Sequence, residues 1–364
     1  KTATGVQNDL LSKWFPASAA GAALDVAPYN ARDGVSPVTP VVILPPAALD
    51  PKNLAVETKP EASLAADSPT VMVDAATGKR IRHLAELDLN AKQPDRQALI
   101  LRPYAPLGYG RKIVVGLTDK LIGKDGKPVA RAPAMEALIA GNFKAGAAGR
   151  LDRDLASWKQ DMISLEKVGV PRAQQRATWH FTTASAQWVT GPAIDLRNQV
   201  VAKVGASGLG VQIESIEVDP SALALLPNLQ ATPLPAGATV VIAPLQPDIA
   251  LRIKGKFETP DGMLKGQTAE ATLNWAADGS PKAVLQAANQ WRPFALTASP
   301  KALQAKTSPP LTLYGHGFLR TVCGEDLCVK PNQPDAAGRL FAGAGAVAVG
   351  TDWWGLSQAE IGVA

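Results

Sequence analysis

The sequence predicts a mixed fold, in which a β-sandwich is followed by a region of α/β architecture. Short apolar runs separated by clusters of Pro, Gly and Asp occupy residues 31–185, a pattern typical of a sandwich. The last part of residues 248–364 is ordered as strand, turn, helix and strand, and this alternation indicates an α/β sheet. A length of 364 residues agrees with about two domains.

Composition narrows the class of protein. Apolar residues make up 46% of the chain and charged residues 19%, with 31 Gly and 30 Pro, so the chain is folded and rich in turns. The net charge of +5 comes from short basic clusters in which charged and apolar residues alternate, as on the solvent face of a strand. We therefore predict no nucleic-acid partner, and the sequence indicates no cofactor or metal.

The cysteines and the chain start bear on the compartment. Cys323 and Cys328 could form a small-loop disulfide or half of a metal site, and the lack of a neighbouring His or further Cys favours the disulfide. The sequence contains no run of roughly 18 apolar residues, so it predicts no membrane-spanning helix. The start at Lys1 suggests a processed N-terminus. We expect a secreted, periplasmic or cell-envelope protein.

The first half of the chain is expected to contain an arm, a sandwich and one added helix. Residues 1–30 are the arm, which we expect to pack through Leu10, Leu11, Trp14 and Phe15. Strands are predicted at 41–44, 70–73, 98–101, 112–117 and 177–185, with a tight turn at Asp125-Gly126. The helix follows from spacings of four and three that place five apolar side chains on one face, namely Leu151, Leu155, Trp158, Met162 and Leu165.

The second half begins with a connection. Residues 186–247 are predicted to be a short helix and a Pro-rich linker, because proline cannot continue helices or central strands. Two hairpins are predicted around Asp261-Gly262 and Asp278-Gly279, followed by a strand at 290–299. The strands 311–314 and 346–350 enclose a helix within 324–345.

A Gly-His-Gly turn follows the strand 311–314. The glycines at 315 and 317 let the backbone turn sharply, so that the N–H of Phe318 could point at a carbonyl oxygen as negative charge develops on it. The alternative is that the glycines only shape a strand-to-helix turn, with His316 a buried imidazole. An oxyanion-hole turn at His316, Gly317 and Phe318 is therefore one of two interpretations of this stretch.

These stretches resemble a known family. Gly315-His316-Gly317, the later Gly350-Thr351-Asp352-Trp353-Trp354-Gly355 and the leading stretches "DGVSP" and "WHFTTAS" resemble secreted bacterial α/β-hydrolases of the esterase and lipase-like kind that carry an N-terminal immunoglobulin-like domain. The resemblance covers about residues 30 to 364, the N-terminal part of such a protein. It implies an immunoglobulin-like sandwich over 31–185, the first half of a hydrolase domain over 248–364, and ester hydrolysis through a serine acyl-enzyme.

The nucleophile is missing from the sequence. A serine hydrolase needs a Ser on a tight elbow, then an acid and a His, yet no Gly-x-Ser-x-Gly occurs and no His follows His316. Ser357 lies in an incomplete elbow. Our hypothesis is that the nucleophile and base lie on a companion C-terminal fragment of the same precursor. Trp353 and Trp354 then either wall an acyl pocket or cap the core, while Asp352 holds the loop through backbone N–H groups.

A second class of function fits part of the sequence. A non-catalytic binding or adhesion protein of the cell envelope would explain the missing Ser elbow, although it has no use for a helix crossover. Two weaker candidates are the Ser164-x-x-Lys167 spacing on the predicted helix and a metal site from His83, Glu86 and Asp88. The substrate, whether a lipid, a short acyl ester or a polyester, does not follow from the sequence.

Overall fold

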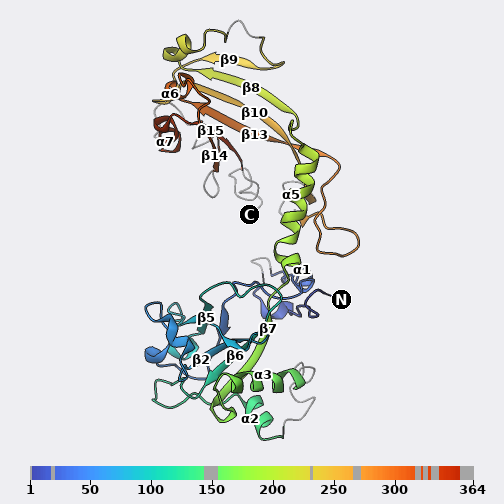
Figure 1. The fold of residues 1–364 in the computed structure, drawn as a ribbon, viewed down its shortest axis with the longest axis vertical. Helices are drawn as coiled ribbons and strands as arrows, with labels where there is room; N and C mark the ends of the chain where they lie inside the picture. Colours follow the sequence, from blue (N-terminus) through green and yellow to red (C-terminus); the bar gives the residue numbers. More distant parts are fainter. Residues whose placement is uncertain are drawn as a thin grey trace. The chain divides into compact units, whose positions relative to one another are not determined.

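The fold is described from a computed structural model, which covers residues 2–17, 21–142, 155–229, 233–264, 272–315, 321–322, 327–328 and 336–352. These residues form a mixed α/β protein with several sheets, mostly strands and few helices (Figure 1). The chain divides into two compact units, Lys1–Gly191 and Pro192–Ala364. No helix within the described ranges is long and apolar enough to cross a membrane.

The first unit contains two antiparallel sheets with the strand orders β1-β5-β4 and β3-β2-β6-β7. Its strands are β1 (Val41–Ile43), β2 (Thr70–Asp74), β3 (Lys79–Arg80), β4 (His83–Leu87), β5 (Leu99–Pro103), β6 (Lys112–Thr118) and β7 (Gln175–Thr182). Its helices are α1 (Ala27–Asn30), α2 (Pro133–Ile139), α3 (Leu155–Lys167) and α4 (Ala186–Val189). The five strands predicted for this half are confirmed, and β3 and β4 are two further strands that were not among them.

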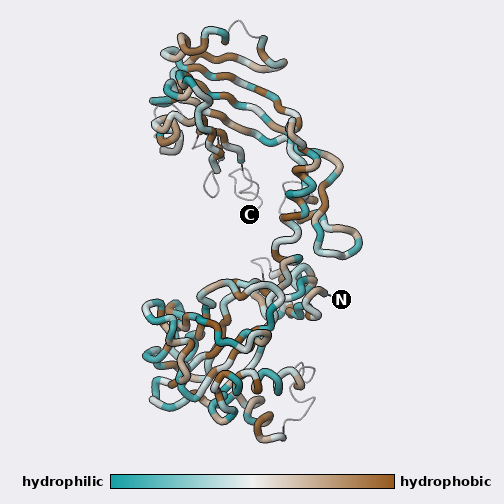
Figure 2. The backbone as a smooth tube through the Cα atoms, viewed as in Figure 1, coloured by the Kyte–Doolittle hydropathy of each residue, from teal (hydrophilic) through white to brown (hydrophobic). Residues whose placement is uncertain are grey.

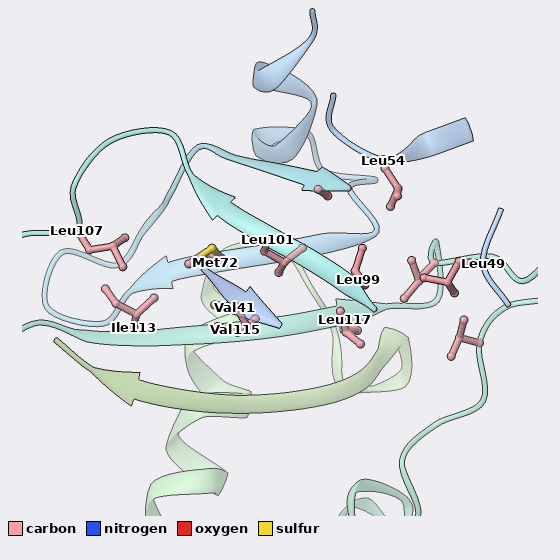
Figure 3. Close-up of a cluster of buried hydrophobic side chains, with 13 residues drawn as sticks. Val41, Leu49, Leu54, Met72, Leu99, Leu101, Leu107, Ile113, Val115 and Leu117 are labelled. Carbon is pink, nitrogen blue, oxygen red and sulfur yellow. The ribbon is translucent and has the colours of Figure 1, made fainter. Parts of the chain in front are cut away.

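One hydrophobic core lies between the two sheets. Alternate residues of β6, including Val115 and Leu117, point to the same face, and Leu99 and Leu101 of β5 join them in one buried cluster. Figure 3 shows these side chains gathered between the strands of the two sheets. The two sheets therefore stabilise each other through a shared apolar layer.

Helix α3 covers the outer face of the four-stranded sheet. Val114 of β6 and Leu165 of α3 are both fully buried in a second cluster, and a Cβ on Gly116 would lie 2.6 Å from Leu165 Cδ1. Strand β6 is thus covered on both faces, which explains its almost continuous apolar run. The predicted helical face is confirmed for Met162 and Leu165, which are both buried.

A buried carboxylate anchors α3 to the sheet. Asp161 has no exposed side-chain surface, and its two oxygens lie 2.5 Å from His180 Nδ1 of β7 and 2.8 Å from Lys112 Nζ of β6. Lys112 also donates to Ser157 Oγ at 2.8 Å. One ion cluster therefore holds the helix to two strands. No periodic pattern in the sequence predicts this cluster.

The N-terminal arm does not pack as expected. Trp14 and Phe15 are 55% and 37% exposed, so the prediction that both anchor the arm is wrong. Hydrogen bonds hold it instead, from Asn8 N to the Arg32 carbonyl at 3.0 Å and from Leu10 N to Asn30 Oδ1 at 2.7 Å. Polar contacts at the turn around Asn30 replace the aromatic packing.

The second unit is built on a six-stranded sheet with the order β14-β15-β13-β10-β8-β9. Hydrophobic residues, brown in Figure 2, recur along its strands. The strands of this unit are β8 (Val211–Val218), β9 (Thr239–Ile242), β10 (Leu251–Pro260), β11 (Met263–Leu264), β12 (Thr272–Leu273), β13 (Asn289–Ala298), β14 (Leu311–Gly315) and β15 (Val347–Thr351). Its helices are α5 (Gly191–Val204), α6 (Pro300–Leu303) and α7 (Ala336–Ala344).

Two expectations for this unit differ from the structure. The segment 186–247, expected to be a helix and a linker, also contributes β8 and β9 to the large sheet. The hairpin predicted around Asp261-Gly262 is wrong, because β10 pairs with β13 and β8 over long ladders rather than folding back on itself. Asp261 instead accepts a hydrogen bond from Met263 N at 2.9 Å, which turns the chain into the small β11–β12 ribbon.

The strand–helix–strand order at the end of the chain is confirmed. β14 and β15 are parallel neighbours, with Leu311 opposite Val347 and Gly315 opposite Thr351, and α7 lies between them in the sequence. Parallel neighbours require a crossover of this kind. β15 also pairs antiparallel with β13, which fixes β14 at one edge of the described sheet.

Candidate functional site

The predicted oxyanion turn begins where β14 ends. β14 stops at Gly315, so His316, Gly317 and Phe318 follow it directly in the sequence but lie outside the described residues. Trp353, Trp354, Cys323 and Ser357 also lie outside them. The structure therefore describes the frame from which these segments leave the sheet.

That frame is the end of the six-stranded sheet at which β14 and β15 finish. The parallel strands β14 and β15 end in register, with Gly315 opposite Thr351. Neighbouring strands lie about 4.8 Å apart. The chain consequently leaves β14 after Gly315 and β15 after Thr351 at neighbouring points, at the carboxyl ends where open α/β sheets bind ligands.

A hydrogen bond and close packing tie the chain after β14 to this end of the sheet. Asp352 Oδ1 accepts a hydrogen bond from Val322 N at 2.7 Å, which confirms its predicted structural role. Val322 and Leu327 are buried against Ala295 and Ala348 in a separate hydrophobic cluster. Gly350 permits this approach, since a Cβ there would lie 2.6 Å from Val322 Cγ2.

A buried arginine forms a second tie from the centre of the sheet. Arg252 of β10 is 5% exposed, donates to the Leu327 carbonyl at 3.2 Å and binds Glu217 Oε2 at 2.8 Å. It also donates to Gln246 Oε1. Lys254 Nζ lies 2.6 Å from the other Glu217 oxygen. Arg252 thus links β8 and β10 to the segment that carries Cys328, whose predicted disulfide stays a prediction because Cys323 is not described.

Glu217 is ionised because its cations outweigh its burial. Burial alone would raise the pKa of this carboxyl, but the hydrogen bonds and charges of Lys254 and Arg252 lower it below its ordinary value of 4.5. A carboxylate with a depressed pKa stabilises the folded state above its unfolded pKa, and this stabilisation is lost as the pH falls through the folded pKa. Glu217 therefore favours the folded sheet at neutral pH.

We predict that Glu217→Gln destabilises the chain by about 1.5 kcal/mol at pH 7 and by much less near pH 3. Urea unfolding at the two pH values measures the difference. Glu214→Gln on the same strand is the matched control, because Glu214 pairs with Lys256 at 2.7 Å with both side chains about half exposed. Its effect should stay within about 0.5 kcal/mol at both pH values. An equal loss for Glu217→Gln at pH 3 and pH 7 would contradict the prediction.

A pocket of about 250 Å³ opens at the same end of the sheet. It is lined by Thr351 at the end of β15, by the next residue Asp352, and by Phe257 of β10 and Arg292 of β13. Apolar and charged side chains thus meet beside the end of β15, as in small-molecule sites.

The remaining candidates play structural roles or lie outside the described residues. His83 is buried, with Nδ1 2.9 Å from the Ile81 carbonyl and Nε2 2.8 Å from Thr70 Oγ1. Burial lowers the pKa of His83, so the ring is a neutral core imidazole, and no group of metal-binding side chains occurs among the described residues. Ser164 donates to the Gln160 carbonyl within its own helix at 3.0 Å.

The chain has no significant match among known protein families, curated proteins or solved structures.

Proposed function

We propose that this chain is part of a secreted carboxylic-ester hydrolase of the α/β type, which works through a serine acyl-enzyme. In this proposal the turn after β14 supplies the oxyanion hole through the N–H of Phe318, flanked by His316 and Gly317. The observation that carries the proposal is the position of Gly315-His316-Gly317 at the carboxyl end of a parallel strand that crosses through α7 to β15.

The order of strands supports this assignment. α/β-Hydrolases take one oxyanion N–H from the loop between the third strand and the following helix. Along the chain β14 is the fifth strand of the large sheet, after β8, β9, β10 and β13, and α7 follows it. Within residues 248–364, the proposed hydrolase half, β10, β13 and β14 are the first three strands of this sheet, and only in that count does the Gly-His-Gly stretch follow the third strand.

Rigidity of the frame also supports it. An oxyanion donor acts only if it is held in place before charge develops, and loss of one donor costs on the order of 3 kcal/mol in transition-state stabilisation. The Asp352 and Arg252 contacts hold the chain a few residues beyond the turn. A Cys323–Cys328 bridge would stiffen the same segment, and Trp353 and Trp354 would line the acyl side of the site.

The nucleophile and the His base belong, in this proposal, to a companion C-terminal segment. Leu311 and Leu313 share one face of β14 and are 69% and 68% exposed, and Leu340 of α7 is 69% exposed. Parallel strands are normally covered on both faces. In this proposal the exposed leucines therefore present an apolar surface against which the companion segment packs. The two sheets of the first unit, three and four strands over one core, support an immunoglobulin-like leading domain.

The first test is denaturing mass spectrometry of the native sample after incubation with a fluorophosphonate probe. We expect a second polypeptide that co-purifies with this chain and carries the probe. A single unlabelled species of 38.0 kDa would contradict the proposal and favour the binding-protein alternative.

Phe318→Pro tests the oxyanion donor in the same two-polypeptide preparation without the probe, because the probe blocks the serine nucleophile. Proline has no N–H, so we expect kcat to fall by about a hundredfold to a thousandfold with little change in KM. Phe318→Leu is the control, because it alters the side chain and keeps the N–H. Equal losses of kcat in both variants would show that the Phe318 N–H does not act as an oxyanion donor.

A further inference from the structure

The first unit has a pocket of about 370 Å³ at one end of its two-sheet core. Leu49, Leu54 and Ala85 line it and are at most 5% exposed, and all three belong to the core cluster. Figure 3 shows Leu49 and Leu54 at the opposite end of the cluster from Leu107. Val56 and Leu89, which are 48% and 88% exposed, also line it. The pocket thus brings exposed apolar side chains at the surface together with buried residues of the core.

The wall of this pocket is held in place by backbone hydrogen bonds. Ala85 N of β4 donates to the Ala55 carbonyl at 2.8 Å, and Asp50 N donates to the Ile122 carbonyl at 2.9 Å. Lys124 N donates to the Ala48 carbonyl, also at 2.9 Å. Residues 48–55, along one side of the pocket, are therefore fixed to β4 and to residues 122–124. A ligand would thus meet a preformed cavity, and little free energy would be lost in ordering the pocket wall.

One cation that lines the pocket has no counter-ion among the residues that the structure describes. Glu86 also lines it, but its carboxylate is bound by Arg102 Nε at 2.6 Å. Gln97 donates from its amide to the Asp88 carbonyl at 3.3 Å. Lys124 lines the same pocket and makes no ion pair with any residue in the described ranges. A ligand that combines an apolar body with one negative charge would match both features.

We propose that this pocket binds a free medium-chain fatty acid, with the aliphatic chain against Leu49, Leu54 and Ala85 and the carboxylate on Lys124. The volume lies within the usual range of roughly 300–1,000 Å³ for small-molecule pockets. A single unbranched chain can follow the apolar path inward, and its charged end can stay at the solvent side. The site is independent of the ester hydrolase proposal, because all of its residues lie in the first unit.

The test is calorimetric titration of the full chain with octanoate, decanoate and dodecanoate below their critical micelle concentrations. Each pair of added methylenes that becomes buried should tighten binding roughly fifteenfold until the pocket is full. Burial of apolar surface should also give a negative heat-capacity change. No binding, or the same affinity for all three acids, would overturn the proposal.

Two variants with matched controls locate the site. Val56→Trp should weaken decanoate binding at least tenfold by filling the pocket, while Val42→Trp, at a 63% exposed position on β1 that does not line it, should not. Lys124→Gln should weaken decanoate binding by about twofold to fivefold and leave the binding of methyl decanoate unaffected. Lys127→Gln serves as its control. Unchanged binding in Val56→Trp would place the ligand elsewhere, and unchanged binding in Lys124→Gln would overturn the carboxylate contact.

Discussion

Gly255→Ala is expected to open the six-stranded sheet between β8 and β10. A Cβ at Gly255 would fall on the carbonyl oxygen of Gln212, a backbone atom of the neighbouring strand that cannot rotate away. Phe294 Cε1 would lie 2.9 Å from the same Cβ. The register also shifts between Lys254 and Gly255, so the clash falls at an irregularity of the β8–β10 ladder. We expect a loss on the order of 3 kcal/mol in local stability.

Hydrogen exchange measures this loss where it occurs. Amides of β8 and β10 should lose at least a hundredfold in protection, while the strands of the first unit keep theirs. Gly343→Ala in α7 is the matched control, because nothing lies within 4 Å of its added Cβ and alanine favours a helix. That variant should gain about 0.5 kcal/mol. Native protection of β8 and β10 in Gly255→Ala would contradict the prediction, because it would show that the ladder accommodates the added Cβ without opening.

Asp161→Ala is expected to release α3 from the first unit. The substitution leaves Lys112 and His180 without their shared carboxylate, at a position with no exposed surface. Removing one partner of a buried ion pair costs about 3–5 kcal/mol. Lys112 and His180 are 31% and 25% exposed and can be hydrated in part, so we expect a value near 3 kcal/mol.

Urea unfolding followed by tryptophan fluorescence checks this result, because Trp158 lies on α3 and Trp179 on β7. Glu166→Gln on the same helix is the control. Glu166 forms a surface pair with Arg172 at 2.8 Å, and its loss should cost at most about 0.5 kcal/mol. Equal midpoints for the two variants would mean that the other contacts of α3, such as the packing of Leu165 and Met162, hold the helix without the carboxylate.

Part of the candidate site follows from local sequence. Two glycines around His316 after an apolar run mark a strand end and a turn, and the run itself forms β14 as predicted. The structural role of Asp352 also follows from its place at a strand end, as its bond to Val322 confirms. Arg252 was missed as a site residue, because within "LRIKGKF" it has the alternating pattern of a solvent-facing strand residue. Its burial arises only when the chain around Leu327 folds over the sheet.

The sequence by itself determined the local elements of this protein. Periodicity marked α3, and apolar runs marked β14 and β15 as strands, because a residue's own neighbours decide a helical face or an apolar strand. Only the tertiary structure decided which strands pair. Asp261-Gly262 has the composition of a hairpin turn, yet β10 pairs with β13 across an intervening ribbon and with β8 from the expected linker. Such pairings, like the Asp161 cluster, depend on packing between distant segments, which no local pattern records.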